Sequence, residues 1–349
     1  MLNSQIGSPI FICGYPKSGT TLLLALLDHH PELLVFPEET RFFKNIINHP
    51  DRQNTDYVLT QTSVKNLGLG KFRMTSGARD YSDINFSTYK TCLETLWRDS
   101  DGDGRSLLES ILHCYGRATG QLGKKYWIEK TPFTEIHLNK ANRLWPDFKA
   151  LYMIRDPRDN YCSHSDLRHR RHLARKNKYA HTDEETREKH LSPPLEMEDF
   201  VAYWLDSIAH WRRFAARNES QCLLIRYGGL VQNPRQELGR ICDFLEICWD
   251  DVLLRPTRNG SLWGGNSMHG TQFTGISTSS LGRYSQHLTK NEICFLEGLL
   301  GKTMRRYGWA IEHTDSSSWK QMSDLLLSPD TKLFIKVKAL LGLLKQQTN

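Results

Sequence analysis

Short apolar runs that each lead into a loop recur along the chain and predict buried β-strands. These runs cover Pro9–Gly14, Tyr126–Glu129, Lys149–Arg155 and Cys222–Tyr227. Segments with helical spacing of apolar residues follow them, at Thr21–His29, Glu135–Leu144, Phe200–Ala216 and Pro234–Leu245. This alternation predicts an α/β fold with a mostly parallel sheet, helices on both faces, and ligands at the carboxyl ends of the strands.

Two segments depart from this alternation. Residues 51–83 have weak periodicity and many turn residues, and we expect irregular structure there, near an acceptor site. Residues 1–315 are expected to form one domain, and residues 316–349 an amphipathic tail helix that is too short to span a bilayer. The tail carries lysines among apolar residues, so it could lie in a membrane interface, associate with a second subunit, or pack on its own domain.

The composition is that of a globular protein with a preference for anionic ligands. Of the 349 residues, 39% are apolar and 24% charged, and 46 Lys+Arg against 39 Asp+Glu give a net charge of +7. We expect no nucleic-acid partner, because no RNA- or DNA-binding motif accompanies that charge. The eight cysteines show no metal-ligand spacing with histidines, and no signal peptide is apparent, which together favour a reduced, cytoplasmic protein.

The run "IFICGYPKSGTTLLLALL", which begins at Ile10, reads as a strand, a tight loop and a helix. Such a loop directs backbone N–H groups and the positive end of a helix dipole at an anion. Gly14 and Gly19 have the spacing of a nucleoside-triphosphate loop, but Thr20 replaces its lysine, and the lysine lies earlier, at Lys17. No acidic strand end offers a Mg²⁺ ligand, so an ATPase or kinase is disfavoured.

The letters P-K-S-G-T-T after a first strand resemble the 5′-phosphosulfate loop of sulfotransferases that use 3′-phosphoadenosine 5′-phosphosulfate (PAPS). The resemblance implies that the donor is held by five consecutive residues. They are Lys17, Ser18, Gly19, Thr20 and Thr21. The alternative is an ordinary turn between a strand and a helix, with Lys17 in solvent.

A second motif lies in "KALYMIRDPRDNYCSH". Arg155 at a strand end and Ser163 in the next helix are eight residues apart, so a guanidinium and a hydroxyl can converge on one phosphate. The spacing resembles the 3′-phosphate site of sulfotransferases. Alternatively, Arg155 pairs with Asp156 or Asp159.

Two later segments also resemble this family. In "LLIRYGGLVQNPRQELGRICDFLEI", the resemblance places Tyr227 beside the adenine, although the ring could instead pack under the following helix. The segment "LGRYSQHLTKNE" resembles the late part of the family, with an aromatic residue ahead of the last helix.

The run P-E-E-T-R after the first helix resembles tyrosylprotein sulfotransferases and related bacterial sulfotransferases. By that likeness Glu39 is the general base, and Arg41 helps to position the acceptor and the sulfuryl group. Glu38 is the reserve candidate, because one extra residue separates this motif from the phosphate loop. His29 and His30 are rival bases, but at a helix end they are expected to cap carbonyls.

Three further residues have assigned roles in transition-state stabilisation. Lys17 and the loop amides can neutralise charge on the leaving phosphate oxygen, so no metal is required. Lys130 in "YWIEKTPF" matches the lysine of an N-K-D-P-F run in tyrosylprotein sulfotransferases, although Glu129 and Thr131 depart from it. Ser267 in "WGGNSMHGT" approximately matches a late serine that contacts the sulfuryl region.

The acceptor is the least defined part of the site. Six basic residues between His164 and His181, against Asp166 alone, could recognise an acidic peptide, a uronate-bearing glycan or a sulfated sugar, or could form a solvated helix face. The resemblance implies transfer of a sulfuryl group from PAPS to a hydroxyl of a peptide, glycan or lipid-linked acceptor, with adenosine 3′,5′-bisphosphate (PAP) as product. The alternatives are a P-loop kinase and a non-catalytic PAP- or phosphate-binding module.

Overall fold

A computed structural model describes residues 6–68, 71–74, 77–81, 84–99, 103–184, 191, 194–265 and 273–312. The chain divides into two compact units. The sheet unit comprises Met1–Ile154 and His210–Thr278, and the helical unit comprises Arg155–Ala209 and Ser279–Asn349. The predicted boundary at residue 315 and the tail after it lie outside the described residues. Within the described residues, the structure contains no helix that combines the length and the apolarity needed to cross a membrane.

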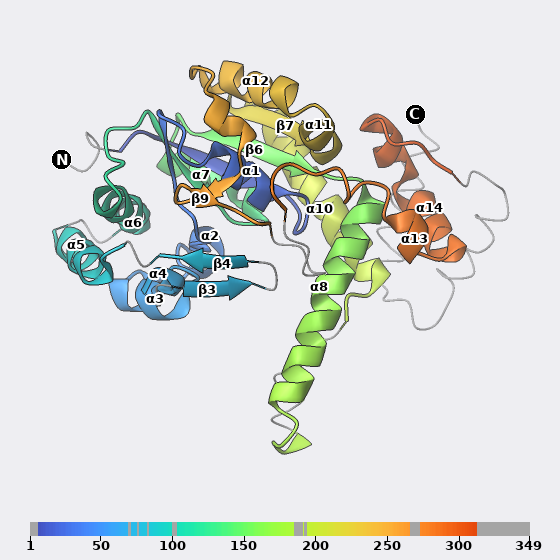
Figure 1. Ribbon diagram of the computed structural model, residues 1–349, viewed down its shortest axis with the longest axis horizontal. Helices are drawn as coiled ribbons and strands as arrows, with labels where there is room; N and C mark the ends of the chain where they lie inside the picture. The colour runs from blue at the N-terminus through green and yellow to red at the C-terminus, as the bar shows by residue number, and fades with distance from the viewer. Residues whose placement is uncertain are drawn as a thin grey trace. The chain divides into compact units, whose positions relative to one another are not determined.

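A parallel five-stranded sheet forms the centre of the sheet unit (Figure 1). Its strands, in spatial order, are β2 (Leu33–Val35), β5 (Tyr126–Lys130), β1 (Ser8–Cys13), β6 (Lys149–Ile154) and β7 (Cys222–Arg226). This confirms the predicted fold class and the four predicted strands. The sequence did not reveal β2, because three residues are too few to show a period.

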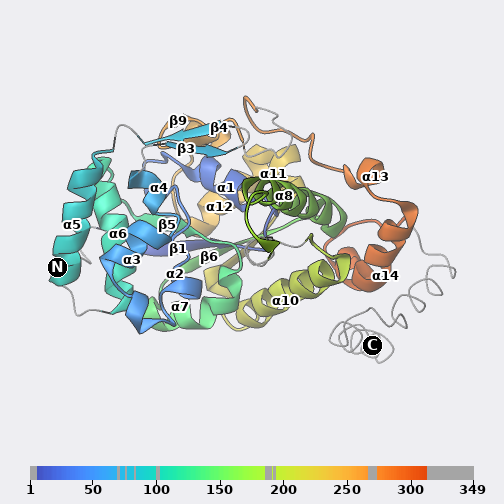
Figure 2. The same ribbon diagram turned by 90° about the horizontal axis from the view of Figure 1, so that it is seen from below.

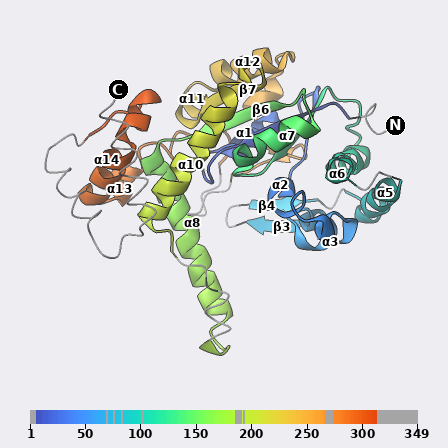
Figure 3. The same cartoon turned by 180° about the vertical axis from the view of Figure 1, so that it is seen from behind.

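Helices cover both faces of this sheet. Figure 2 shows α1 (Thr20–Leu27) and α12 (Pro234–Leu245) on one side of the strands and α7 (Leu138–Leu144) on the other. Figure 3 looks onto the face that α7 covers. On that face Phe11 of β1 lies 5.7 Å from the rings of both Trp127 and Trp145, so aromatic packing fills the space between sheet and helix.

The segment of residues 51–83 is more ordered than expected. It contains the 3₁₀ helix η2 (Pro50–Arg52), the helices α3 (Thr55–Gln61) and α4 (Lys65–Gly68), and a hairpin of β3 (Lys71–Met74) and β4 (Gly77–Asp80). The expectation of irregular structure is therefore wrong. These elements are too short to show periodicity, and burial of Val58 and Leu67 stabilises the two helices instead.

The other elements connect or flank these. In the sheet unit they are α2 (Phe42–Asn45), α5 (Phe86–Arg98), α6 (Gly104–Ala118), η3 (Thr134–His137), η4 (Glu219–Gln221), α11 (Tyr227–Gln232), η5 (Asp251–Leu254), β8 (Thr257–Arg258) and β9 (Ser261–Leu262). In the helical unit they are α8 (Pro157–Lys178), α13 (Tyr284–His287) and α14 (Lys290–Arg306). Helix α10 (Met197–Ala215) contributes to both units.

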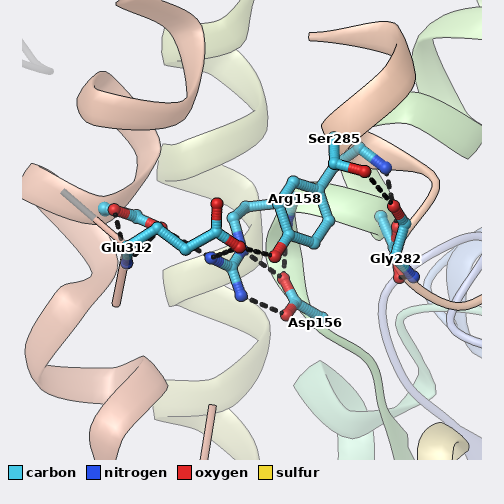
Figure 4. A network of polar contacts seen from close by, with 8 residues as sticks. Asp156, Arg158, Gly282, Ser285 and Glu312 are labelled. Atoms are coloured by element: carbon cyan, nitrogen blue, oxygen red, sulfur yellow. Dashed lines mark hydrogen bonds and ion pairs between the residues drawn. The ribbon is translucent and has the colours of Figure 1, made fainter. Parts of the chain in front are cut away.

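A buried ion cluster joins α8 to α14 in the helical unit (Figure 4). The Arg158 guanidinium lies 2.7 Å from Asp156 Oδ2 and 2.5 Å from Glu297 Oε1, and 4.1 Å from the ring centroid of Tyr284. The hydroxyl of Tyr284 donates a hydrogen bond to Glu312. Because the side chain of Glu297 is 0% exposed, this arginine compensates a carboxylate that water does not reach.

Replacement of Arg158 by methionine should therefore destabilise the protein strongly. Methionine keeps much of the length of the side chain but leaves Glu297 buried without its cation, which typically costs about 3–5 kcal/mol. The free energy of unfolding measured in urea should fall by this amount. Lys90→Ala, which removes a solvent-exposed pair with Glu94, should change it by at most about 0.5 kcal/mol. Equal losses of unfolding free energy in the two variants would contradict the role of Arg158 as the cation that compensates Glu297.

Candidate active site

The loop from Gly14 to Gly19 connects β1 to α1 and has an unusual backbone. Gly14, Lys17 and Gly19 have positive φ angles of +136°, +68° and +102°. The N–H of Gly14 donates to Glu135 Oε2 at 2.9 Å, and its carbonyl accepts from the N–H of Phe133 at 3.2 Å. The turn following β5 therefore fixes the conformation of the loop.

The loop ends at the N-terminus of α1, where backbone amides can bind an anion. Gly19 is the N-cap residue and has no side chain with which to accept from the first-turn amides, including those of Thr20 and Thr21. Ser18 and Thr20 are buried, whereas Lys17 and Thr21 are half-buried. The predicted phosphosulfate residues thus lie together around one helix N-terminus, a geometry that favours a negatively charged ligand.

Tyr227 lies beside this loop. It is the first residue of α11, and a Cβ atom on Gly19 would come within 2.5 Å of its Cδ2 atom. The buried ring thus packs against the loop itself. Adenine contact by Tyr227 stays a prediction.

Glu39, Arg41 and Lys130 are brought together at the end of β5. Lys130 Nζ lies 2.6 Å from Glu39 Oε1, and Arg41 Nε lies 3.9 Å from Glu39 Oε2. Lys130 is almost fully buried, while the Glu39 side chain is 29% exposed. The carboxylate is therefore both held by a lysine and accessible from outside.

Glu38 faces the interior of the sheet unit instead. Its carboxylate is buried and accepts hydrogen bonds from the Tyr81 hydroxyl at 2.5 Å and from Asn66 Nδ2 at 3.3 Å. It thereby links the P-E-E-T-R segment to the segment of short elements that precedes α5. This geometry fits an anchor better than a base.

The two histidines at the end of α1 contact backbone or loop atoms. His30 Nδ1 accepts from the N–H of Glu32 at 3.2 Å, so its Nε2 carries the proton and donates to the Cys248 carbonyl at 2.9 Å. His29 is exposed and lies against Gly260. His30 thus donates to a carbonyl outside α1, so the expectation that it caps the carbonyls of its own helix is wrong, and for His29 that role stays a prediction.

Glu129 is a site residue that the sequence prediction missed. Its Oε1 atom accepts from the Thr131 hydroxyl at 2.6 Å, the Thr40 hydroxyl at 2.9 Å and the Thr40 N–H at 3.2 Å. Burial raises the pKa of Glu129, although the hydrogen bonds of Thr131 and Thr40 and the charge of Lys130 lower it in part. The available signal was a carboxylate inside an otherwise apolar strand.

In the helical unit, Arg155 and Ser163 are in contact, and their binding of a phosphate stays a prediction. Arg155 Nη1 donates to Ser163 Oγ at 3.0 Å, and Nη2 donates to the Ser280 carbonyl at 2.6 Å. Asp156 pairs with Arg158 instead of with Arg155. The Asp159 carboxylate accepts from the N–H groups of Gly282 and Tyr284.

The charge of Arg155 nevertheless acts on Asp159. Burial raises the pKa of Asp159, and the charge of Arg155 and the two backbone donors lower it in part. Since Asp159 also fixes the backbone of the segment that contains Ser280, the surroundings of Arg155 are well determined.

Two other predictions have different outcomes. Ser267 lies outside the described residues, so its role stays a prediction. The basic stretch forms the later part of α8, where Arg168 and Arg170 are half-buried and its other basic side chains are exposed. In the described ranges, no group of three or more His, Cys, Asp or Glu residues has an arrangement that could hold a metal ion.

The glycine at the start of the loop offers a direct test of its geometry. A Cβ atom on Gly14 would lie 2.4 Å from the Met153 carbonyl oxygen, so in Gly14→Ala the backbone has to move. The alanine would also have to adopt an unfavourable positive φ angle. We expect a loss of about 2–4 kcal/mol in the free energy of unfolding. Gly120→Ala, with a positive φ and nothing within 4 Å, should lose only about 1–2 kcal/mol. Similar losses of unfolding free energy in the two variants would show that Gly14 does not lie against the Met153 carbonyl oxygen.

Comparisons with known proteins agree with this geometry. Residues 9–251 match the model of the sulfotransferase family. The chain is 27% identical over 246 residues to protein-tyrosine sulfotransferase 2 of Gallus gallus, and 25% identical over 249 residues to protein-tyrosine sulfotransferase A of Caenorhabditis elegans. Each match covers 70% of this chain but only 53% and 51% of those relatives, about half of their length.

A solved structure supports the fold. The sulfotransferase domain of the Synechococcus PCC 7002 olefin synthase superposes with a TM-score of 0.50 at 16% sequence identity, over 93% of this chain and 96% of that domain. At this identity the likeness concerns the fold alone. The family match covers more than half of the sequence, includes the Gly14–Gly19 loop, the P-E-E-T-R segment and the R-x₇-S pair, and shows that the chain belongs to the sulfotransferase family.

Proposed function

We propose that this sulfotransferase uses PAPS as donor and transfers its sulfuryl group to a hydroxyl of a peptide, glycan or lipid-linked acceptor, releasing PAP. One observation carries the proposal. Lys130 lies opposite Ile12 in the β1–β5 pair, so the Glu39–Lys130 contact is at the strand ends from which the Gly14–Gly19 loop departs. A base and an anion-binding loop are therefore close enough to serve one transfer reaction.

The reaction needs one proton acceptor and a set of donors for growing negative charge. The acceptor oxygen attacks sulfur, the bond between sulfur and the 5′-phosphate oxygen breaks, and Glu39 takes the hydroxyl proton. Lys17 and the loop amides stabilise the charge that develops on the leaving phosphate oxygen, while Lys130 and Arg41 contact the sulfuryl group and the acceptor. Ser267 stays a candidate for the same region.

The remaining donor contacts are those that the sequence motifs predict. Ser18, Gly19, Thr20 and Thr21 would bind the 5′-phosphosulfate, and Tyr227 would lie against the adenine. Arg155 and Ser163 would bind the 3′-phosphate, since a guanidinium fork and a hydroxyl suit a phosphate dianion.

For the acceptor, we favour a peptide with acidic neighbours around its hydroxyl. The names of the relatives support a tyrosine acceptor, and the basic side chains of α8 would complement acidic residues. Radiolabelled PAPS should therefore label acidic tyrosine peptides faster than neutral ones. Calorimetry should detect metal-independent binding of PAP. Mg²⁺-dependent binding of ATP would favour a kinase, and PAP binding without transfer to any acceptor would favour a binding module.

Glu39→Gln should fold and bind PAP nearly normally but transfer sulfate slowly. Glutamine keeps the size of the side chain and removes its basicity, and loss of a positioned base typically lowers kcat about 10²- to 10⁴-fold. The measurement is turnover of radiolabelled PAPS with a working acceptor. Glu38→Gln and His30→Ala are the controls and should show milder losses. Near-normal turnover by Glu39→Gln would eliminate Glu39 as the base.

Arg155→Ala should weaken binding of PAP far more than binding of adenosine 5′-phosphate, which lacks the 3′-phosphate. Loss of a charge-assisted hydrogen bond commonly costs about 1.5–3 kcal/mol. Titration calorimetry with both nucleotides measures the difference directly. If the variant discriminated between them as the unmodified protein does, the 3′-phosphate would bind elsewhere.

A further inference from the structure

We infer that Glu129 is a positioning residue for the reaction: its buried carboxylate fixes the backbone turn that aims Glu39 and Arg41. The inference rests on the proposed function, since it gives Glu39 and Arg41 their roles. Three consecutive residues at the end of β5 contact three consecutive residues of the P-E-E-T-R segment. Glu129 bonds Thr40, Lys130 pairs with Glu39, and Thr131 accepts from the N–H of Arg41.

Strand geometry explains why both segments are held so firmly. Neighbouring residues in a strand point to opposite faces of the sheet, so Glu129 and Lys130 extend in opposite directions. One side chain holds residue 40 and the other holds residue 39. The segment is thus attached at two points on either side of the strand end.

The hydrogen bonds form two relays that end on one oxygen atom. The N–H of Phe42 donates to the Thr40 hydroxyl at 3.2 Å, and the N–H of Arg41 donates to the Thr131 hydroxyl at 3.3 Å. Both hydroxyls donate in turn to Glu129 Oε1. Since a carboxylate only accepts, it orients both hydroxyl hydrogens toward itself and leaves their lone pairs for the two amides.

The relays hold a backbone conformation that needs support. Arg41 has a φ angle of +53°, in the left-handed region that a residue with a Cβ atom rarely adopts. Such a conformation persists when its surroundings determine it from several sides. Here the amides of Arg41 and of the next residue are both fixed through Glu129, and the turn places Arg41 and Glu39 in contact.

A carboxylate is a costly choice for this buried strand position. Burying the charge is costly, and an apolar residue would suit a strand whose other buried members are mostly apolar. Glu129 bears that cost, and its partner Thr40 belongs to the segment that carries the base. The desolvation cost is offset by hydrogen bonds that fix the residue next to Glu39.

The test compares Glu129→Ala with Glu129→Gln, which keeps an acceptor oxygen for the same donors. Radiolabelled PAPS and a working hydroxyl acceptor give kcat and the KM for PAPS. Glu129→Ala should lower kcat about 10- to 100-fold, because small displacements of catalytic groups have effects of this size, and should leave the KM for PAPS within about twofold. Glu129→Gln should recover most of the lost turnover.

Glu109→Ala is the matched control for the loss of a buried carboxylate. Glu109 of α6 is also buried, and its Oε1 atom accepts from Trp145 Nε1 and from Arg105 Nε, each at 2.8 Å. This variant should lower the melting temperature without the loss of kcat. Thr40→Val and Thr40→Ser form a second matched pair, and only valine should slow turnover. The double variant Glu129→Ala/Thr40→Val should be no slower than Glu129→Ala alone. The relay through Thr40 ends on Glu129, so Glu129→Ala already breaks it.

Hydrogen–deuterium exchange of the peptide containing Arg41 and Phe42 tests the placement without any activity. Exchange of these amides should speed up in Glu129→Ala and stay slow in Glu129→Gln and Glu109→Ala. Unchanged exchange, equal kcat losses in Glu129→Ala and Glu109→Ala, or multiplying losses in the double variant would each overturn the inference. Faster exchange in a protein that transfers no sulfate would uphold the positioning and reject the proposed function. If Glu129→Ala does not fold, the Thr40 pair decides by the same exchange measurement.

Discussion

The parallel pairing of β1 with β5 places the Gly14–Gly19 loop and the Glu39–Lys130 pair at one edge of the sheet. Parallel strands run in the same direction, so both end at the same edge of the sheet. At that edge β1 leads into the Gly14–Gly19 loop, while β5 ends in Glu129 and Lys130. The turn after β5 returns to bond Gly14, so the loop and the P-E-E-T-R segment are both attached to the end of one strand.

Buried carboxylates provide these attachments. Glu129 accepts hydrogen bonds from backbone and hydroxyl groups, and Glu135 accepts from the N–H of Gly14. Glu38 accepts from the Tyr81 hydroxyl and from the side-chain amide of Asn66. Each carboxylate bears the cost of desolvation, which its hydrogen bonds offset. These hydrogen bonds therefore hold the backbone of both segments in place before any ligand binds.

In the helical unit, buried ion pairs fix the backbone. Arg158 neutralises carboxylates from α14 and from the start of α8, and thereby fixes the first turns of α8. Those turns carry Ser163 and Asp159, which determine the surroundings of Arg155. A guanidinium that is already oriented loses less entropy when it binds a phosphate.

Local patterns in the sequence determined the parts of the protein whose cause is local. Apolar runs predicted four of the five strands of the sheet, because burial on both faces requires such runs. Loop letters and the eight-residue spacing singled out the Gly14–Gly19 loop and the neighbourhood of Arg155 and Ser163, since a few neighbouring residues form each of them. The orientation of Glu38, the relays of Glu129 and the short elements of residues 51–83 were decided by the tertiary structure alone. The partners of the two carboxylates lie far away in the chain, as with Glu129 and Thr40, which are 89 residues apart, and only folding brings such residues into contact. The short elements have nearer partners, as in the β3–β4 pair, but are too short to show a period in the sequence.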